Sequence, residues 1–244
     1  MKRNQILTLA SGLCVILIHL SADTVNAQSF LNLNFETANV SASPAEFFPN
    51  YVSVGTALPD WTAYLGANQQ TQVGYNAPAN STASITLIGP SWNSADVGRY
   101  GVGIIDGNYS VDLQTGLDPN GTTLDNVLIE QYGTVPSTSQ SLLFKAFETT
   151  PLTVSFNGNA LAPVALSTGT SSDGLPYTLY GVNISSLANQ SGELEFTADF
   201  NGSFNYVVLD DISFSTTAVP EADVAVLTGI GGLVFGARRW LARR

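Results

Sequence analysis

Cysteine, histidine and methionine are almost absent from this chain. Its one cysteine (Cys14), one histidine (His19) and one methionine (Met1) all lie within the first twenty residues. Beyond His19 the chain therefore offers no disulfide and no zinc site built from cysteine and histidine. Nucleophilic catalysis by a Ser-His-Asp or Cys-His pair is excluded there for the same reason.

Basic residues are also scarce. Between Gln28 and Ala218 only Arg99 and Lys145 stand against sixteen carboxylates, which gives a net charge of −14. A domain of this charge repels phosphate backbones and anionic lipids, so nucleic-acid binding is excluded. With 44% hydrophobic and only 11% charged residues, the chain has enough apolar surface for a large core. Acidic surfaces of this kind suit secreted domains and calcium binding.

The N-terminal segment has the pattern of a secretory signal peptide. Lys2 and Arg3 precede an apolar run over residues 6–20, and a polar stretch then ends in Val25-Asn26-Ala27. Small residues at these positions predict cleavage between Ala27 and Gln28. We expect residues 1–27 to direct the chain to the Sec export machinery, and the alternative is a permanent N-terminal anchor.

The C-terminal segment has a different pattern. Residues 224–237 are uncharged, and as a helix they span about 21 Å at ~1.5 Å per residue. That is short of the ~30 Å hydrocarbon core, but Trp240 and Leu241 extend the run, with Arg238 and Arg239 reaching back to the headgroups. We expect a short membrane helix over 223–241 with its arginines in the cytoplasm.

The order of motifs in this tail is specific. Val219-Pro220-Glu221, a glycine-rich apolar segment and a final arginine cluster together resemble the PEP-CTERM sorting signal, with Ala222 where a second proline is usual. The resemblance covers residues 217–244 and implies recognition by an exosortase-type membrane protease. It also implies an inner-membrane stage before processing, then the cell surface or an extracellular matrix rich in exopolysaccharide. Pro220 keeps the recognised segment extended.

The region between the two ends reads as β-structure. Apolar and polar residues alternate over 152–158 and 192–200, and similar runs occur over 83–89 and 140–147. Turn sequences at 118–121, 171–174 and 200–203 separate them. No helical stripe stands out, although 185–192 can supply one short turn. The pattern predicts a single all-β domain over 28–216 with about ten strands, an antiparallel sandwich or jelly roll.

Several phrases of this domain, in their order, resemble carbohydrate-binding-module-like (galactose-binding-like) jelly rolls. They are "LNLNFET", "LPDWTAY", "GNYSVDLQ", "VLIEQYGTVP", "YGVNISSLANQSGELEFTA" and "YVVLDDISFS". The resemblance implies a structural calcium ion between the first and last strands, at Glu36 and Asp210 or Asp211. Neighbouring side chains on a strand point to opposite faces, so one of the two aspartates must face inward and needs a partner. The alternative is a solvated or strand-capping pair.

Other polar and aromatic residues allow competing interpretations. Asp106, Asp118, Asn120 and Asp125 lack EF-hand spacing and are expected in ordinary turns. Stacking on a sugar ring needs an exposed aromatic side chain, whereas the alternative for each aromatic residue is a place in the core. The aromatic candidates for glycan binding are Trp61, Trp92 and Tyr100, followed by Tyr64 and Tyr109.

The resulting prediction is an exported, non-enzymatic protein of the cell surface or extracellular matrix, with exopolysaccharide as a candidate partner. One rival is a secreted carbohydrate-active enzyme that uses paired carboxylates, for which Asp60, Glu130 and Glu148 are candidates. The other rival is a purely structural adhesin.

Overall fold

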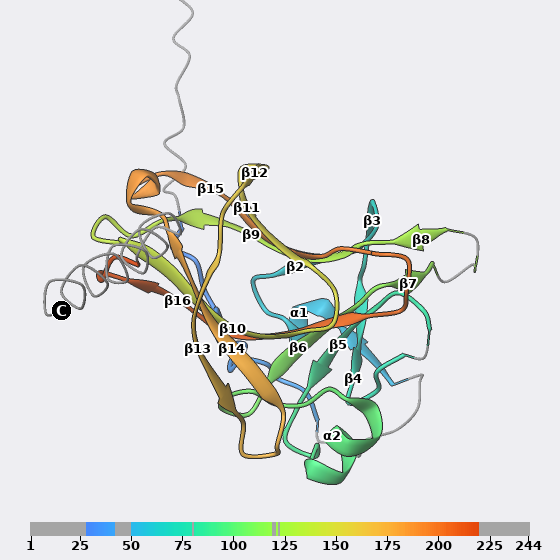
Figure 1. Ribbon diagram of the computed structural model, residues 1–244. Helices are drawn as coiled ribbons and strands as arrows, with labels where there is room; N and C mark the ends of the chain where they lie inside the picture. The colour runs from blue at the N-terminus through green and yellow to red at the C-terminus, as the bar shows by residue number, and fades with distance from the viewer. Residues whose placement is uncertain (1–27, 42–49, 80, 119–120, 122, 220–244) are drawn as a thin grey trace, which may run out of the picture.

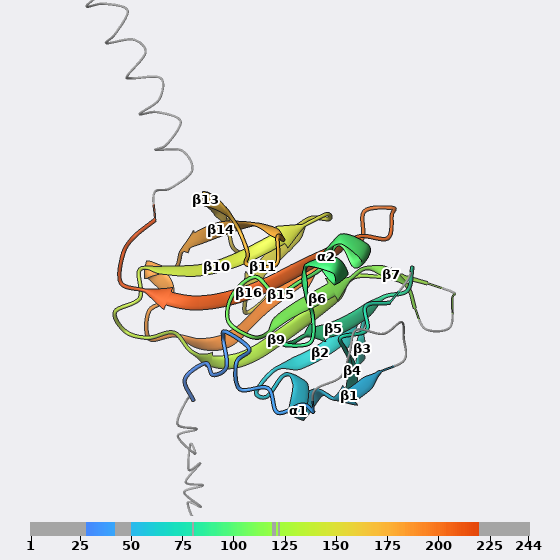
Figure 2. The same cartoon turned by 90° about the horizontal axis from the view of Figure 1, so that it is seen from below.

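The computed structural model describes residues 28–41, 50–79, 81–118, 121 and 123–219. They form two large β-sheets that pack face to face, with one small helix on an outer face (Figures 1 and 2). The all-β sandwich is therefore confirmed. The predicted signal peptide, the membrane helix over 223–241 and every sorting residue from Pro220 onward lie outside the described residues.

The larger sheet has eight strands in the order β1-β4-β5-β6-β16-β10-β14-β13. All neighbours are antiparallel except β4 and β5. Its strands are β1 (Tyr51–Ser53), β4 (Gln72–Tyr75), β5 (Ser84–Ile88), β6 (Ser110–Gln114), β10 (Ser141–Glu148), β13 (Val164–Thr170), β14 (Pro176–Asn183) and β16 (Tyr206–Ser215).

The smaller sheet has six antiparallel strands in the order β12-β11-β15-β9-β2-β3. They are β2 (Thr62–Leu65), β3 (Asn68–Gln69), β9 (Val127–Thr134), β11 (Leu152–Phe156), β12 (Asn159–Ala160) and β15 (Ser191–Ala198). A separate two-stranded ribbon joins β7 (Gly116–Leu117) to β8 (Leu124–Asp125). The helical elements are α1 (Val54–Ala57), α2 (Ser94–Tyr100) and the 3-10 turn η1 (Ser185–Leu187), the last as expected.

The main core lies between the two sheets and takes one face of each strand. On β15, Leu194 and Phe196 are buried in this core, whereas Glu193 and Glu195 lie on the outer face. This alternation agrees with the sequence pattern. On β11, Leu152, Val154 and Phe156 face the same core, although Ser155 between the last two is buried as well. Burial of such side chains contributes about 1.5–3 kcal/mol each, which fixes the register because a slip by one residue would expose the whole set.

A second, smaller core covers the outer face of the eight-stranded sheet, where α2 packs near β5 and β6 (Figures 1 and 2). The expectation that no helix stands out was wrong here. Asn93 caps α2, and its side chain and Asp96 form a reciprocal capping box, a local signal that the sequence "NSAD" carries. The helix buries Val97 and Tyr100 partly against the apolar residues Ile88, Trp92, Val102, Ile104, Ile105, Leu175 and Val208.

One carboxylic acid is enclosed beneath this second core. Asp112 on β6 is 0% exposed, and neither of its carboxyl oxygens has a hydrogen-bond partner among the described residues. In the sheet it lies between Thr86 and Val208. Burial raises the pKa of Asp112 to about 8, because an apolar environment disfavours the charged form.

The end of the sandwich also differs from the expected boundary at residue 216. Val219 is only 9% exposed and its side chain packs against Gly181 on β14, which has no Cβ to obstruct it. Upstream, the Ser141 hydroxyl donates to the carbonyl of Thr217. The described fold therefore holds the chain up to the residue before Pro220. Among the described residues, no helix has the length and apolar character needed to cross a membrane.

Candidate functional site

The first component of the candidate site is a turn near the beginning of the described chain. Phe35 is fully buried and has a left-handed backbone (φ 59°), a conformation that costs about 1 kcal/mol or more outside glycine. The turn is held by the Asn32 side chain, which accepts a hydrogen bond from the Thr37 amide and donates one to the Pro59 carbonyl. With Phe35 anchored in the core, Glu36 projects toward the loop that precedes β6.

That loop receives the Glu36 carboxylate on its backbone. Oε1 of Glu36 accepts hydrogen bonds from the amides of Asn108 (2.7 Å) and Tyr109 (3.0 Å), and Oε2 accepts one from the Asn108 side chain. Gly107 makes this approach possible, since a Cβ there would lie 2.3 Å from Oε1. Its φ of 59° also favours glycine.

The second carboxylate comes from the last strand. Asp210 is 1% exposed, and its Oδ2 accepts hydrogen bonds from the Asp106 amide (2.9 Å) and the Ser110 hydroxyl (2.6 Å). Its Oδ1 accepts from the Asp211 amide at 2.6 Å. Glu36 and Asp210 thus bind the same loop from opposite ends of the sequence.

A β-bulge changes the expected orientation of the aspartate pair. On β16 the pairing moves from Asp210–Lys145 to Ser213–Leu143, so two residues, Asp211 and Ile212, stand opposite one on β10. Asp211 has a φ of 48°, and the extra residue breaks the strict alternation. Consequently both aspartates line one pocket, while Ile212 packs in the main core. Strict alternation therefore does not hold at this bulge, although one aspartate of the pair, Asp210, is buried and hydrogen-bonded as expected.

Lys145 supplies the positive charge beside these carboxylates. It lies directly opposite Asp210 in the sheet, and its ammonium contacts the carboxylates of Asp106 and Asp211, the latter at 3.0 Å. Burial by itself would lower the Lys145 pKa, but the hydrogen bonds and attraction of the two aspartates outweigh it and raise the pKa overall. The hydrogen bond from Lys145 lowers the pKa of Asp106.

These residues line a small pocket of about 160 Å³, formed by Asn34, Glu36, Asp106, Gly107, Asp210 and Asp211. Four carboxylates face one cation there. Burial raises the pKa of Asp210 to about 7, helped by the charge of Asp211 and opposed by its hydrogen bonds. A buried carboxylate in this state gains most from a further positive charge nearby.

The oxygen donors of this pocket are of the kind that calcium binds, although among the described residues only Glu130, Glu193 and Glu195 bring one carboxylate oxygen each within 4.8 Å of one another. Hard oxygen donors come from up to four carboxylates and from the amide of Asn34, and calcium takes six to eight oxygen ligands. Glu36, Asp210 and Asp211 converge, as expected for the calcium hypothesis. Asp106 was expected in an ordinary turn and instead lines the pocket. Its sequence signal was weak, because "IDGNYS" is a common turn sequence. Asp106 and Asp210, which meet in the pocket, are also 104 positions apart in the chain.

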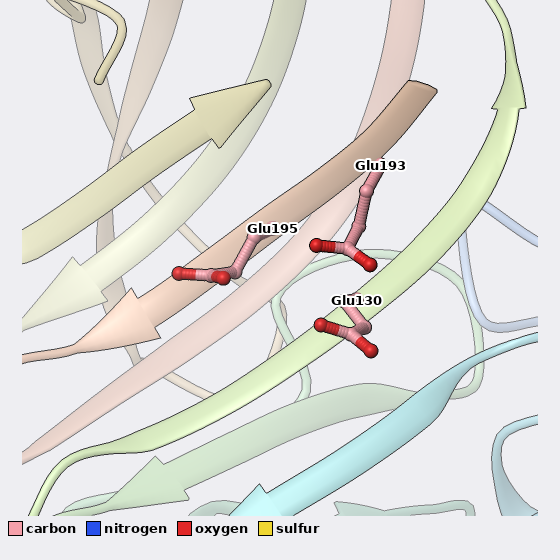
Figure 3. Close-up of side chains that lie close together, drawn as sticks. All are labelled: Glu130, Glu193 and Glu195. Carbon is pink, nitrogen blue, oxygen red and sulfur yellow. The ribbon is translucent and has the colours of Figure 1, made fainter. Parts of the chain in front are cut away.

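A second acidic cluster lies on the outer face of the six-stranded sheet. Glu130 on β9 is directly paired with Glu195 on β15, and Glu193 is two positions away on the same strand. Their side chains lie close together (Figure 3), with one oxygen of each carboxylate within 4.8 Å of the others. All three side chains are partly buried.

The charges and hydrogen bonds of this cluster change the pKa values of the side chains in and beside it. Burial raises the pKa of Glu130, and so do the charges of Glu193 and Glu195, whereas a hydrogen bond from Tyr64 lowers it. That same hydrogen bond raises the pKa of Tyr64. A hollow of about 520 Å³ adjoins the cluster at Glu195, with a lining that includes Asp125, Asn126, Thr153, Thr197 and Asp199. Like charges placed opposite each other in a sheet are destabilising, so the three glutamates make this face of the sheet less stable than neutral residues would.

The aromatic candidates for sugar stacking lie elsewhere. Trp61 and Trp92 are each 4% exposed, Trp61 in the main core and Trp92 in the second core. Their indole nitrogens donate to backbone carbonyls of Asn32 and Val102. Neither offers a ring face to solvent, so their expected role in glycan binding was wrong. Tyr100 on α2 is partly buried against the Trp92 ring at 5.1 Å.

The remaining predicted residues are scattered. The hydrolase candidates Asp60, Glu130 and Glu148 lie in three different places: a loop, the six-stranded sheet and the eight-stranded sheet. Glu148 accepts a hydrogen bond from the Tyr180 hydroxyl, and burial raises its pKa. Of the sorting and cleavage residues, Gln28 and Val219 are described. Ala27, Pro220, Glu221, Arg238 and Arg239 fall outside the described residues.

Comparison of the chain with protein-family models, with curated proteins and with solved structures gives no match.

Proposed function

We propose that this chain is an exported, non-enzymatic protein of the cell surface or extracellular matrix, and that a calcium ion ties the two ends of its sandwich together. The observation that carries this proposal is the convergence of Glu36 and Asp210 on one loop and one pocket. A jelly-roll topology is part of the proposal. It is supported by the repeated crossing of the chain between the two sheets from β9 through β16, with β11 and β12 in one sheet and β13 and β14 in the other.

Bound calcium would supply positive charge to a cluster of carboxylates that has one lysine partner. Glu36 and Asp210 would hold it, with Asp106, Asp211 and the Asn34 amide as further oxygen donors. Their role is structural, because they link the N-terminal turn, the loop before β6 and the last strand. Extracellular calcium modules bind with dissociation constants of about 10⁻⁴–10⁻³ M. A calcium site of this strength would be occupied outside the cell.

Export and sorting rest on the two ends of the sequence. A signal peptide over 1–27 would use the Sec machinery, and the tail from Val219 would hold the chain at the inner membrane until an exosortase-type protease acts. The net charge of −14 between Gln28 and Ala218 suits a soluble matrix component. Exopolysaccharide is the proposed environment of the mature protein.

Calcium titration of thermal unfolding tests the metal. If the dissociation constant is about 0.1 mM, then about 10 mM calcium stabilises by roughly 2.7 kcal/mol, a rise in Tm of about 5–10 °C for a domain of this size. Glu36→Gln and Asp210→Asn are expected to abolish the rise, whereas Asp173→Asn, in the turn between β13 and β14, keeps it. An equal Tm in calcium and in chelator contradicts the calcium part of the proposal.

Mass spectrometry of the native protein from cell fractions tests the rest. The expected mature chain begins at Gln28, lacks the arginine tail and occurs in the surface or matrix fraction. Recovery of the intact chain from the cytosol, with Met1 and Arg244 both present, contradicts export.

One observation favours a second candidate function, carboxylate-dependent hydrolysis of a glycan. Glu130 lies within reach of two further carboxylates beside a hollow and has a raised pKa, features that an acid and base pair needs. A reducing-sugar assay over a panel of polysaccharides tests it. Turnover that disappears in Glu130→Gln but persists in Glu148→Gln supports an enzyme, and the absence of turnover on the whole panel supports the non-enzymatic function.

A further inference from the structure

A second pocket lies at the other end of the eight-stranded sheet, where β4 and β5 separate. These two strands are paired in parallel at only two positions, Gly74–Thr86 and Tyr75–Leu87. On the side of Gln72 and Ser84 the pairing stops, and residues of both strands line a pocket of about 320 Å³. This is at the lower end of the range for small-molecule sites, about 300–1,000 Å³.

The lining of this pocket combines an apolar floor with a polar rim. Leu65, Val73 and Ile85 belong to the main core and form the floor. Tyr51, which is 47% exposed, and the carboxamide of Gln72 lie at the rim. The Gln72 side chain is exposed and makes no hydrogen bond within the described part of the chain. An aromatic ring, amide groups and apolar carbon together match a ligand that has both hydroxyl groups and C–H faces.

Ser84 in the wall adds an independent observation. It is 8% exposed, and its hydroxyl has no hydrogen-bond partner in the described part of the chain. A buried hydroxyl without a partner is destabilising, and such a group in the wall of a binding pocket is satisfied when a ligand hydroxyl reaches it. The neighbouring Gln114, opposite Ser84 in the sheet, already donates its amide to the Thr82 carbonyl.

Charge narrows the class of ligand. Among the described residues that line this pocket, none has a charged side chain, although the surrounding domain carries many carboxylates. An anionic ligand would meet a repulsive field with no cation to bind it, and a cationic ligand would find no carboxylate in the pocket. The lining therefore selects a neutral molecule.

We propose that this pocket binds the terminal residue of a neutral glycan. Its volume suits about one or two sugar units rather than a length of polymer. The proposal rests on the proposed matrix function, in that it names the chemistry of the glycan and the site that holds it. The calcium pocket at Glu36 and Asp210 is a different site, formed by different residues.

Titration of the isotope-labelled protein with methyl galactoside, methyl glucoside and methyl mannoside tests the proposal, with glucuronate as the charged probe of similar size. Binding of one neutral glycoside in the range of about millimolar is expected. Its chemical-shift changes should centre on the backbone amides of residues 70–74 and 82–85, and glucuronate should give none there.

Variants separate a ligand contact from a structural effect. Ser84→Ala is expected to weaken binding roughly three- to tenfold, the effect of one neutral hydrogen bond. Its Tm should stay unchanged or rise, because the substitution removes a buried hydroxyl without a partner. Ser155→Ala changes a buried serine on β11, outside the pocket, and is the matched control with unchanged affinity.

A second pair of variants keeps the test decisive if Ser84→Ala fails to fold. Tyr51→Ala removes the exposed ring at the rim and should weaken binding, whereas Tyr132→Ala removes an exposed ring from the opposite sheet and should not. The proposal is overturned if no neutral glycoside shifts the pocket amides, if glucuronate binds there equally well, or if the shifts centre on β9 and β15. If calcium binding and the processed termini are found as expected but no neutral glycoside binds, this inference alone is wrong.

Discussion

Replacement of Asp112 by asparagine isolates the energetic effect of one buried charge. The Asp112 carboxyl is fully buried beside Val208 and lacks a hydrogen-bond partner. The other titratable group that it influences is Tyr206, whose pKa is raised by burial and by the Asp112 charge. Asp112→Asn keeps the size of the side chain and removes its ionisation.

The magnitude follows from the pKa of Asp112, which burial raises from 3.8 to about 8. A folded-state pKa above the unfolded value means that the folded protein binds the proton more tightly. The stability is therefore greatest below pH 4 and falls as the pH rises toward 8. At 1.36 kcal/mol for each pH unit, the loss is on the order of 5 kcal/mol, a large part of the 5–15 kcal/mol typical of a domain.

Urea unfolding at several pH values between 5 and 9 measures this effect. At pH 5 the loss has only begun, at roughly 1.6 kcal/mol for the 1.2 pH units above the unfolded pKa, and by pH 8.5 Asp112→Asn should gain several kcal/mol more, or about 10 °C in Tm. Other titrating groups, such as Asp210, are common to both proteins and cancel in the difference. A difference that stays constant from pH 5 to pH 8.5 refutes the reasoning.

Three further substitutions test the pocket at Glu36 and Asp210 and the end of the fold. Gly107→Ala should lower the unfolding free energy in urea by about 3 kcal/mol or more, because the added Cβ would lie 2.3 Å from Oε1 of Glu36. Gly121→Ala is the control, since Gly121 has a similar φ but open space around it, and this change should cost only about 1–2 kcal/mol. Lys145→Met should lower the Tm in chelator by a few degrees, and calcium should restore part of the loss; an unchanged Tm would count against its role. Gly181→Ala should displace Val219, whose Cγ1 lies 2.5 Å from the added Cβ, and should speed proteolysis after Glu221; equal cleavage rates would show that the docking does not protect the tail.

The pocket at Glu36 and Asp210 shows which of its residues sequence reasoning pointed to and which it missed. "NFET" and "LDD" are local phrases, and they led to Glu36, Asp210 and Asp211. The bulge at Asp211 had no signal in the sequence, because it depends on how β16 pairs with β10. Asp106 and Lys145 were also missed as members of the site, since a turn aspartate and a strand lysine become partners only through long-range pairing.

For the aromatic residues, sequence reasoning proposed a binding role for side chains that lie in the core. Trp61 and Trp92 were candidates for sugar stacking, yet both are core residues with satisfied indole nitrogens. Composition cannot distinguish a tryptophan that faces the core from one that faces a ligand, because both positions favour a large ring with one donor. The pocket between β4 and β5 was likewise invisible, since its lining comes from four separate segments.

The sequence by itself determined the β-class of this domain, the faces of strands such as β15, the absence of thiol and imidazole chemistry beyond His19, and the acidic balance. These follow from residue type and from a period of two, which are properties of the local chain. Tertiary structure alone decided which carboxylates meet, which one is buried without a partner, and where the sheet opens into a pocket. Such features depend on contacts between residues far apart in the chain, and only the folded sandwich brings those residues together.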